Sequence, residues 1–363
     1  MIHWVLWMTI FASGASGAEE GITAKSPVRV IDEIDIRFMA LSPRLGLSIS
    51  LIAFGDEDGE TTFANIACCG VGSAQKFVRD VRIEGDGQAL KLTHSDAGWT
   101  VRHAPSARLR IDYRLPPTGP MTVDAGVPEQ LRPIVRPDLF HVVGTFDLLL
   151  PTGRRQADLV QVRIDATRVA GNDHFVSSFG GGSPLTARVA RSQITKSLYL
   201  GGAIALAMHE TPEGRVAIAS SGMNSGFAAG QFSEDALAIL AAVRKFFGDS
   251  QPWYLISIHG GERENAAINI GGGMGLTNSF VTFASSDLDA DLQQHREQFR
   301  WGLAHEYFHH WNGLGLRLAA QPGAKRDDIA TYWFSEGVTE FYTMRILTRI
   351  GLQTSERSVR ILD

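Results

Sequence analysis

The stretch His305-Glu306-Tyr307-Phe308-His309 decides how the C-terminal half of this chain folds and what it can bind. On a helix, residues four positions apart differ by about 40° of rotation, so His305 and His309 project from one face. Two imidazoles on one face can hold a single metal ion. Glu306 lies one step round the helix, where its carboxylate can reach a water molecule on that ion. The stretch therefore predicts a metal-binding helix with a base beside the metal.

The spacing of these residues also indicates which metal they prefer. Two histidines and a glutamate so arranged form the H-E-x-x-H pattern of zinc peptidases, with the glutamate as general base. A catalytic zinc ion takes three protein ligands and leaves its fourth position to water. We expect the third ligand to be Glu336, in the segment 333–340 (WFSEGVTE), because an antiparallel second helix can bring it opposite the histidines. The sequence thus predicts one Zn²⁺ per chain, held by His305, His309 and Glu336, with Glu306 as the catalytic base.

Other histidines remain alternative third ligands. His310 follows His309 directly and points about 100° away from it on a helix, which disfavours binding to the same ion. His259 and His295 have no support from spacing.

Two polar residues are candidates for supporting the ligands. Metal-bound imidazoles usually donate their second ring N–H to an acceptor that fixes their orientation. Glu340, one turn beyond Glu336, is either that acceptor or a carboxylate on the helix surface. Asn312 either orders the turn after the motif or simply caps the helix.

Composition excludes several broad classes. The chain has 363 residues, 44% of them hydrophobic and 20% charged, which is typical of folded protein and predicts two or three domains. Its net charge of −5 gives no electrostatic case for a nucleic-acid partner. The adjacent Cys68 and Cys69 rarely meet disulfide geometry, so we expect no structural disulfide.

The N-terminus resembles a secretory leader. An apolar run from Trp4 to Ala12 precedes small residues that end at Ala18, which predicts a signal peptide over residues 1–18 and a secreted or periplasmic protein. No later segment is apolar enough to span a bilayer, so we expect no membrane span in the mature chain.

Two structural regions follow from the patterning. Residues 19–170 hold short stretches that alternate apolar and polar residues, such as 47–53 and 109–115, which predicts an all-β, sandwich-like domain. Residues 171–363 mix strands with helices, so the fold class is α+β, with the catalytic domain second. The expected elements of that domain are a strand at 253–258, a strand at 266–283 that is interrupted by the glycines at 271–273, and helices at 233–247, 286–311 and 328–351.

The segments 305–312 (HEYFHHWN) and 333–342 (WFSEGVTEFY) together resemble the glycyl aminopeptidase family of gluzincins, whose catalytic domain is thermolysin-like. The resemblance implies a zinc peptidase acting on peptides or proteins, with a β-rich domain first. It also implies that His305, His309 and Glu336 are the ligands and Glu306 the base. It extends over most of residues 28–350.

The segment 272–279 (GGMGLTNS) departs from that family at one position. The family's substrate strand has two glycines, an apolar residue, then Glu-His, with Asn-Ser shortly after. The resemblance places the substrate-binding residues at Gly272, Gly273, Met274, Gly275 and Asn278. Gly275 stands where the family has an acid, the natural partner of a free N-terminal ammonium. Its presence argues against strict aminopeptidase specificity, whereas backbone recognition of an extended peptide can persist.

The second departure concerns length. Family members continue beyond the helix of the third ligand, so the end of the sequence at Asp363 predicts a truncated catalytic domain. The leading hypothesis is a zinc metallopeptidase, favoured by the intact Glu306. The alternative is a non-catalytic zinc- and peptide-binding protein, or a truncated remnant of a peptidase, favoured by Gly275 and the early end.

Overall fold

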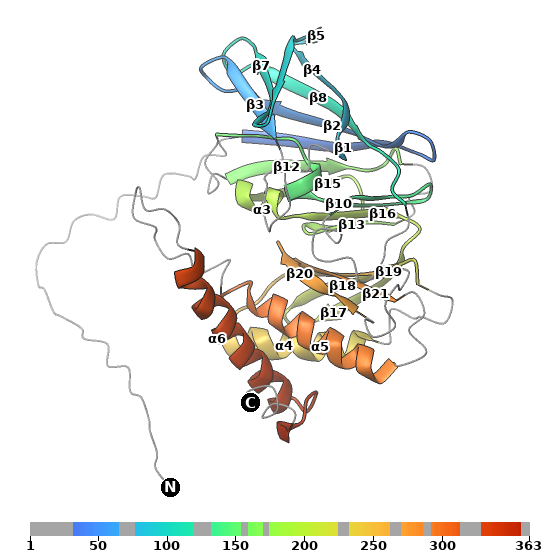
Figure 1. The fold of residues 1–363 in the computed structure, drawn as a ribbon, viewed down its shortest axis with the longest axis vertical. Coiled ribbons are helices and arrows are strands. Elements are labelled where there is room, and N and C mark those ends of the chain that lie inside the picture. The colour runs from blue at the N-terminus through green and yellow to red at the C-terminus, as the bar shows by residue number, and fades with distance from the viewer. Residues whose placement is uncertain are drawn as a thin grey trace, which may run out of the picture.

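The computed structural model describes residues 32–64, 77–119, 132–153, 159–169, 174–223, 232–261, 270–285, 292–312 and 328–356. The predicted signal peptide and the pair Cys68-Cys69 lie outside these ranges. Within them the chain forms four β-sheets, with three long helices packed beneath the lowest sheet in Figure 1.

Three sheets build the N-terminal β region. The first has the order β15-β12-β1-β2-β8-β4-β5. Its strands are β1 (Asp32–Ser42), β2 (Gly46–Phe54), β4 (Arg79–Gly85), β5 (Gln88–Ala89), β8 (Arg108–Leu115), β12 (Leu159–Asp165) and β15 (Leu185–Ala190). The second sheet contains β11 (Leu150–Pro151), β3 (Glu60–Ala64), β7 (Gly98–Arg102) and β6 (Leu92–Ser95). The third contains β14 (Gly180–Gly181), β13 (Phe175–Ser177), β16 (Leu198–Gly202), β10 (Leu139–Val143) and β9 (Ile134–Val135), with short helices α2 (Gly144–Asp147) and α3 (Arg191–Thr195) beside it.

Alternation along the strands produces a shared core between these sheets. In β8, Leu109 and Ile111 are buried while Arg108 and Arg110 face outward. The inward side chains of all three sheets form one apolar cluster, in which Phe38 of β1 stacks on Phe140 of β10 with ring centroids 4.8 Å apart. The predicted sandwich-like β region is therefore confirmed.

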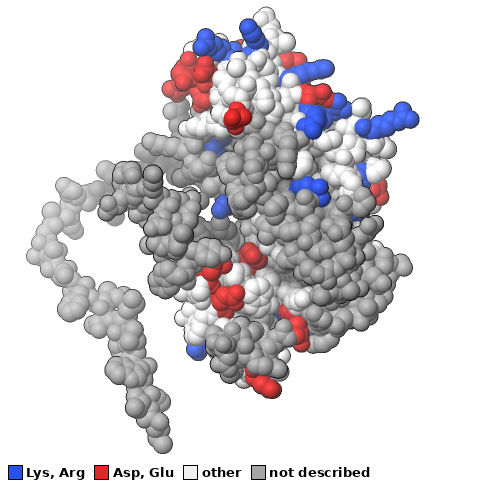
Figure 2. Space-filling model, viewed as in Figure 1, with Lys and Arg blue, Asp and Glu red and all other residues white. Residues whose placement is uncertain are grey.

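The outer face of the first sheet carries charges of both signs. Arg37 pairs with Asp35 at 3.2 Å and Arg110 with Glu84 at 3.0 Å, and Figure 2 shows the blue and red groups interspersed there. Paired surface charges of this kind keep the face soluble and contribute little to stability.

The fourth sheet carries the C-terminal half. Its order is β17-β18-β19-β21-β20, with β18, β19 and β21 parallel to one another. The strands are β17 (Ala205–Thr211), β18 (Gly214–Ser221), β19 (Trp253–Gly261), β20 (Ile270–Leu276) and β21 (Ser279–Ser285). The helices are α4 (Ser233–Phe247), α5 (Leu292–Phe308) and α6 (Asp328–Arg349).

Both faces of this sheet are buried. Ile256 and Ile258 of β19 face the helices, whereas Leu255 faces the third sheet of the β region, as the period of two requires. The sheet is therefore held between the helices and the β region, as Figure 1 shows. The strands up to Gly202 pair within the N-terminal sheets, while the boundary near residue 170 stays a prediction.

The predicted helices are confirmed with small changes at their ends. Helix α4 begins at Ser233 and ends before Gly248, which adopts a left-handed conformation with φ of 63°. Helix α5 ends at Phe308, before the expected end at Trp311, and its predicted start at Ser286 lies outside the described residues. Helix α6 begins at Asp328 as expected and ends at Arg349.

The prediction of a single strand over 266–283 is wrong. The described part forms a hairpin, in which β20 and β21 pair antiparallel and the chain reverses at Thr277-Asn278. The glycines that appeared to interrupt one strand instead belong to β20, the edge strand of the sheet. In the described ranges, no helix has the length and hydropathy needed to cross a membrane.

A buried histidine pair predicts how stability depends on pH. His141 of β10 and His259 of β19 lie across the contact between two sheets, with ring centroids 4.6 Å apart. Burial lowers the pKa of His141 to about 3, and neither of its ring nitrogens has a hydrogen-bond partner among the described residues. The unfolded chain therefore binds one more proton than the folded chain between about pH 6.5 and pH 3.

As the pH decreases below about 6.5, we expect the free energy of unfolding to decrease. His141 contributes up to ~1.4 kcal/mol of this decrease per pH unit. His141→Phe removes this contribution. The free energy of unfolding of the variant, measured by denaturant titration, should therefore decrease less between pH 7 and pH 5 than that of the wild type. His94→Phe, at an exposed position, is the control for replacing a histidine by phenylalanine. Equal slopes for His141→Phe and the wild type would contradict the prediction.

Candidate metal centre

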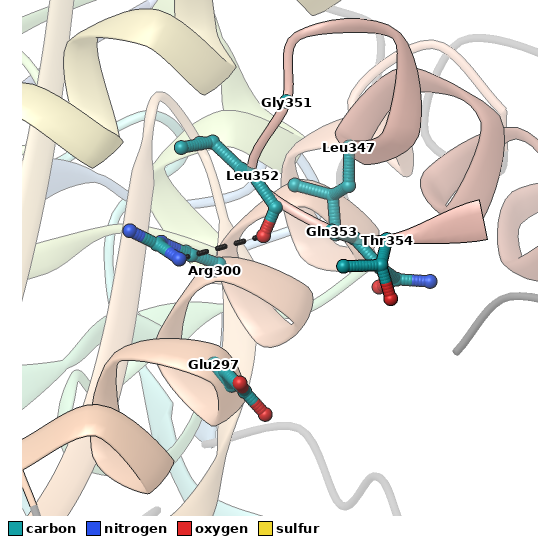
Figure 3. Close-up of a pocket in the computed structure, with 7 residues that line it drawn as sticks. All are labelled: Glu297, Arg300, Leu347, Gly351, Leu352, Gln353 and Thr354. Atoms are coloured by element: carbon teal, nitrogen blue, oxygen red, sulfur yellow. Dashed lines mark hydrogen bonds between the residues drawn. The ribbon is translucent and has the colours of Figure 1, made fainter. Parts of the chain in front are cut away.

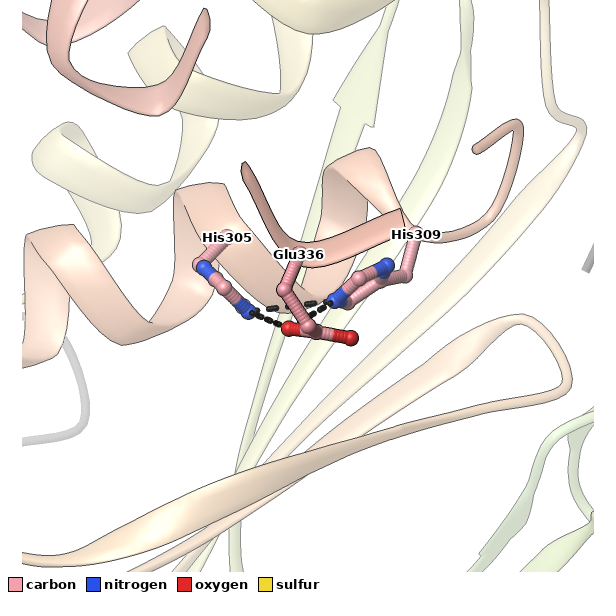
Figure 4. A group of neighbouring side chains, drawn as sticks. All are labelled: His305, His309 and Glu336. Carbon is pink, nitrogen blue, oxygen red and sulfur yellow. Dashed lines mark hydrogen bonds and ion pairs between the residues drawn. The ribbon is translucent and has the colours of Figure 1, made fainter. Parts of the chain in front are cut away.

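Three side chains from two helical segments converge on one point (Figure 4). The Nε2 atoms of His305 and His309 lie 3.0 Å apart. The Oε2 atom of Glu336, on α6, lies 3.2 Å from the Nε2 of His305 and 3.3 Å from that of His309. The structure thus brings together the three residues that the sequence predicted as ligands.

The distances within the trio, as we call His305, His309 and Glu336, fit a zinc ion. Ligand atoms about 2.0–2.1 Å from a tetrahedral zinc ion lie about 3.3 Å from one another, close to the separations observed here. Two imidazole nitrogens and one carboxylate oxygen are also a donor set of catalytic zinc sites. Burial, reinforced by His309, lowers the pKa of His305 to about 4, so its imidazole is neutral at pH 7 and able to ligate. The role of the three residues as ligands stays a prediction.

The turn after α5 orients His309. A helical hydrogen bond from the His309 amide to the His305 carbonyl, at 3.2 Å, continues the helix geometry up to this residue. The Nδ1 atom of His309 lies 2.9 Å from the carbonyl oxygen of Asn312 and donates its proton to it. The Nε2 atom of His309 is thereby left facing His305 and Glu336. The Asn312 side chain donates to the Ser335 carbonyl at 3.0 Å and to Thr339 Oγ1 at 3.1 Å. Asn312 therefore orders this turn and links it to α6.

Glu340 lies close to His305 without a direct hydrogen bond. Its Oε1 atom is 3.8 Å from the Nδ1 of His305, beyond hydrogen-bond distance. Burial raises the pKa of Glu340, and a hydrogen bond from Trp301 opposes that rise. The Trp301 ring also lies 5.0 Å from the His305 ring. Sequence reasoning missed Trp301, although its position four residues before His305 on one helix is a usable signal.

The candidate base points toward the edge strand β20. The backbone N–H of Gly275 donates to Oε2 of Glu306 at 2.8 Å. Burial raises the pKa of Glu306, while the Gly275 N–H opposes that rise. A Cβ atom on Gly275 would lie 2.8 Å from the backbone oxygen of Glu306, closer than such contacts allow. Only glycine therefore permits this approach of β20 to α5, a reason for Gly275 that the sequence did not reveal.

The other histidines considered as ligands lie elsewhere. His259 contacts Ser221 Oγ at 2.7 Å and Ser257 Oγ at 2.9 Å, within the contact between sheets. The Nε2 atom of His310 lies 3.4 Å from the side-chain nitrogen of Gln251. The side chain of His295 lies outside the described part of the chain.

The residues predicted to bind substrate separate into two groups. Gly272, Gly273, Met274 and Gly275 lie on β20, which is in contact with α5. Asn278 lies in the hairpin turn, where its Oδ1 accepts a hydrogen bond from Gln251 at 2.7 Å. Their role in binding substrate stays a prediction.

A separate cavity of about 220 Å³ lies beside the end of α6 (Figure 3). There Arg300 donates to the carbonyl oxygen of Leu352 at 3.4 Å and also binds Asp235. None of the trio lines this cavity.

Comparison with known proteins agrees with the motifs. Residues 298–363, which include the trio, match the M61 glycyl aminopeptidase family. The structure is similar to an aminopeptidase N family protein from Idiomarina loihiensis, with a TM-score of 0.65 and 15% identity, over 90% of this chain and 56% of that one. It is also similar to an M1 zinc metallopeptidase from Deinococcus radiodurans, with a TM-score of 0.50 and 13% identity, over 87% of this chain and 69% of that one. No protein of curated function matches the chain.

These matches confirm the resemblance to the glycyl aminopeptidase family of gluzincins and the α+β fold with a β region first. At such identities the structural neighbours show a shared fold. The chain spans 56% of the length of the Idiomarina protein.

The trio predicts the effect of removing one ligand. We expect the wild-type chain, dialysed after loading with zinc, to retain about one zinc ion per chain by mass spectrometry. His309→Ala should lose it, because two donors hold the ion too weakly. His310→Ala is the matched control and should retain zinc, since its ring contacts Gln251. Full zinc retention by His309→Ala would sink the ligand assignment.

Proposed function

We propose that this protein is a zinc-dependent peptidase in which Glu306 is the general base. The observation that carries the proposal is the convergence of His305, His309 and Glu336 within hydrogen-bond distance of one another, with Glu306 beside the first of them. The match of residues 298–363 to a peptidase family supports the reaction class. The similar fold of a zinc metallopeptidase supports the choice of metal.

Each side chain of the site has a separate role in hydrolysis. When bound, zinc supplies Lewis-acid chemistry, since it polarises a carbonyl group and lowers the pKa of water toward ~7. Glu306 accepts the proton of the attacking water at the carboxylate oxygen that Gly275 leaves free, and returns it to the leaving amine. Its raised pKa makes this carboxylate a stronger proton acceptor, and the Gly275 N–H holds it in place. His305 and His309 would hold the ion through their Nε2 atoms, which lie 3.0 Å apart.

The edge strand β20 supplies a binding surface for an extended peptide. An edge strand offers backbone N–H and C=O groups to an added strand, and β20 lies directly beside Glu306. Gly275 brings no carboxylate that could pair with a free N-terminal ammonium. The substrates we propose are therefore peptides bound through their backbone, without a requirement for a free amine.

We also propose export to the periplasm or beyond, on the strength of the leader-like residues 1–18. Peptides or proteins in that compartment are then the available substrates.

The role of Glu306 separates the enzyme from the binding protein. Glu306→Gln should keep about one zinc ion per chain, because it alters no ligand, yet should lower the rate of peptide hydrolysis by roughly 10³-fold. Rates are measured on a fluorogenic peptide with wild type and variant at equal zinc content. Zinc binding without hydrolysis by the wild type would favour the non-catalytic alternative, and an active Glu306→Gln variant would mean another base.

Gly275 predicts the preference at the peptide's N-terminus. An N-acetylated peptide should be cleaved at least as well as the same peptide with a free amine, because residue 275 offers no anion to the ammonium. The comparison is kcat/KM for the two peptides at pH 7.5. A strong preference for the free amine would overturn this part of the proposal.

A further inference from the structure

A chain of buried hydrogen bonds joins α4, α5 and the turn of the β20–β21 hairpin. The Nε–H of Arg244 donates to the hydroxyl oxygen of Tyr307 at 2.8 Å, and that hydroxyl donates to Oε1 of Gln251 at 3.0 Å. The side-chain amide of Gln251 then donates to Oδ1 of Asn278 at 2.7 Å. Arg244, Tyr307 and Gln251 are each at most 5% exposed.

The chain runs in one direction, which fixes the orientation of its members. Arg244 can only donate, so the Tyr307 hydroxyl must accept from it and donate onward. Gln251 accepts at one end of its amide and donates at the other, so the amide has a single orientation. Breaking any link leaves buried polar groups unpaired, at a cost well above that of a surface hydrogen bond.

Two members of this chain, Tyr307 and Asn278, lie near the contact between the base and the edge strand in sequence. Tyr307 directly follows Glu306 on α5, and Asn278 lies in the turn that follows the strand of Gly275. The hydrogen bond from the Gly275 N–H to Glu306 is a second connection between the hairpin and α5. Gln251 thus bridges the helix that carries the base and the hairpin that holds it.

We propose that Gln251 is a positioning residue that, through Tyr307 and Asn278, holds the Gly275 amide in register with Glu306. This inference rests on the proposed function only where it concerns catalysis. It assigns Asn278, expected from the sequence to bind substrate, to the support of the hairpin. Asn278 adopts a φ of 45°, a left-handed conformation that asparagine and glycine tolerate, and this directs its side chain to Gln251.

The hairpin has other attachments, so loss of Gln251 should shift it without unfolding it. The Thr277 amide donates to the Lys196 carbonyl at 2.8 Å, and the Leu255 amide donates to the Asn278 carbonyl at 2.9 Å. These bonds hold the backbone of the turn to the β region and to β19. The side-chain link through Gln251 joins the turn to α5.

Two substitutions, one at Tyr307 and one at Asn278, test the link through Gln251. Tyr307→Phe removes one hydroxyl, and Asn278→Gly keeps the left-handed backbone while removing the acceptor. Both should lower kcat by about tenfold or more with KM changed less than about twofold, because misplacement of a base slows chemistry without weakening backbone binding. Both should also speed amide hydrogen exchange in residues 273–280, with zinc content unchanged. Asn278→Asp keeps the acceptor for Gln251 and should retain the wild-type rate of amide exchange in residues 273–280.

Tyr113→Phe is the matched control. The Tyr113 hydroxyl is also buried, donates to the Asp147 carbonyl at 2.9 Å and accepts from the Leu149 amide at 3.4 Å, but it lies in the β region. Its loss should lower the Tm and leave kcat and the exchange of residues 273–280 unchanged.

The two readouts separate this inference from the proposed function. Hydrogen exchange needs no turnover, so a wild-type chain without hydrolysis would sink the proposed function alone. Unchanged exchange in residues 273–280 of both Tyr307→Phe and Asn278→Gly would overturn the link. Faster exchange with wild-type kcat would overturn the positioning role.

Discussion

The close approach of helix α5 to strand β20 is the contact on which the arrangement of this site depends. It brings the Gly275 N–H to 2.8 Å from the Glu306 carboxylate. Gly275 makes it possible, since a Cβ there would lie 2.8 Å from the backbone oxygen of Glu306 on α5. The candidate base is therefore held by an edge strand with no side chain at the point of contact.

That contact exists because the fourth sheet is buried on both faces. Alternate residues of β19 pack against the helices on one side and the β region on the other, so the sheet cannot shift without exposing one of two apolar clusters. The burial fixes the position of α5 against the sheet, and α5 carries His305 and Glu306. Since α6 packs on α5, Glu336 is carried to the same point, and Asn312 ties the turn after α5 to α6. Packing thus carries the three residues to one point, and the hydrogen bond from His309 Nδ1 to the Asn312 carbonyl orients one of the two imidazoles.

The sequence predicted the parts of this structure that depend on local periodicity. The spacing of His305 and His309 places them on one helix face whatever surrounds them, and the helices α4 and α6 follow from their apolar periods and terminal residues. Glu336 was reached by assuming an antiparallel return, which the structure contains. The β20–β21 hairpin was not predicted, because a strand rich in glycine has no alternation to reveal its end. Long-range polar contacts, such as that of Tyr307 with Gln251, cannot be predicted from the local sequence around either residue.

Gly275 has two consequences that cannot be separated. Without a side chain it offers no anion to a peptide's N-terminal ammonium, and the same lack of a side chain lets its N–H reach Glu306. An acid at this position would bring a Cβ to 2.8 Å from the Glu306 backbone oxygen and 3.1 Å from its carboxylate, with a second negative charge beside the first. The helix and strand would have to shift to admit it. In this structure, the close approach of the strand backbone to the base and an acidic partner for the free amine at residue 275 therefore compete for the same space, and Gly275 provides the close approach.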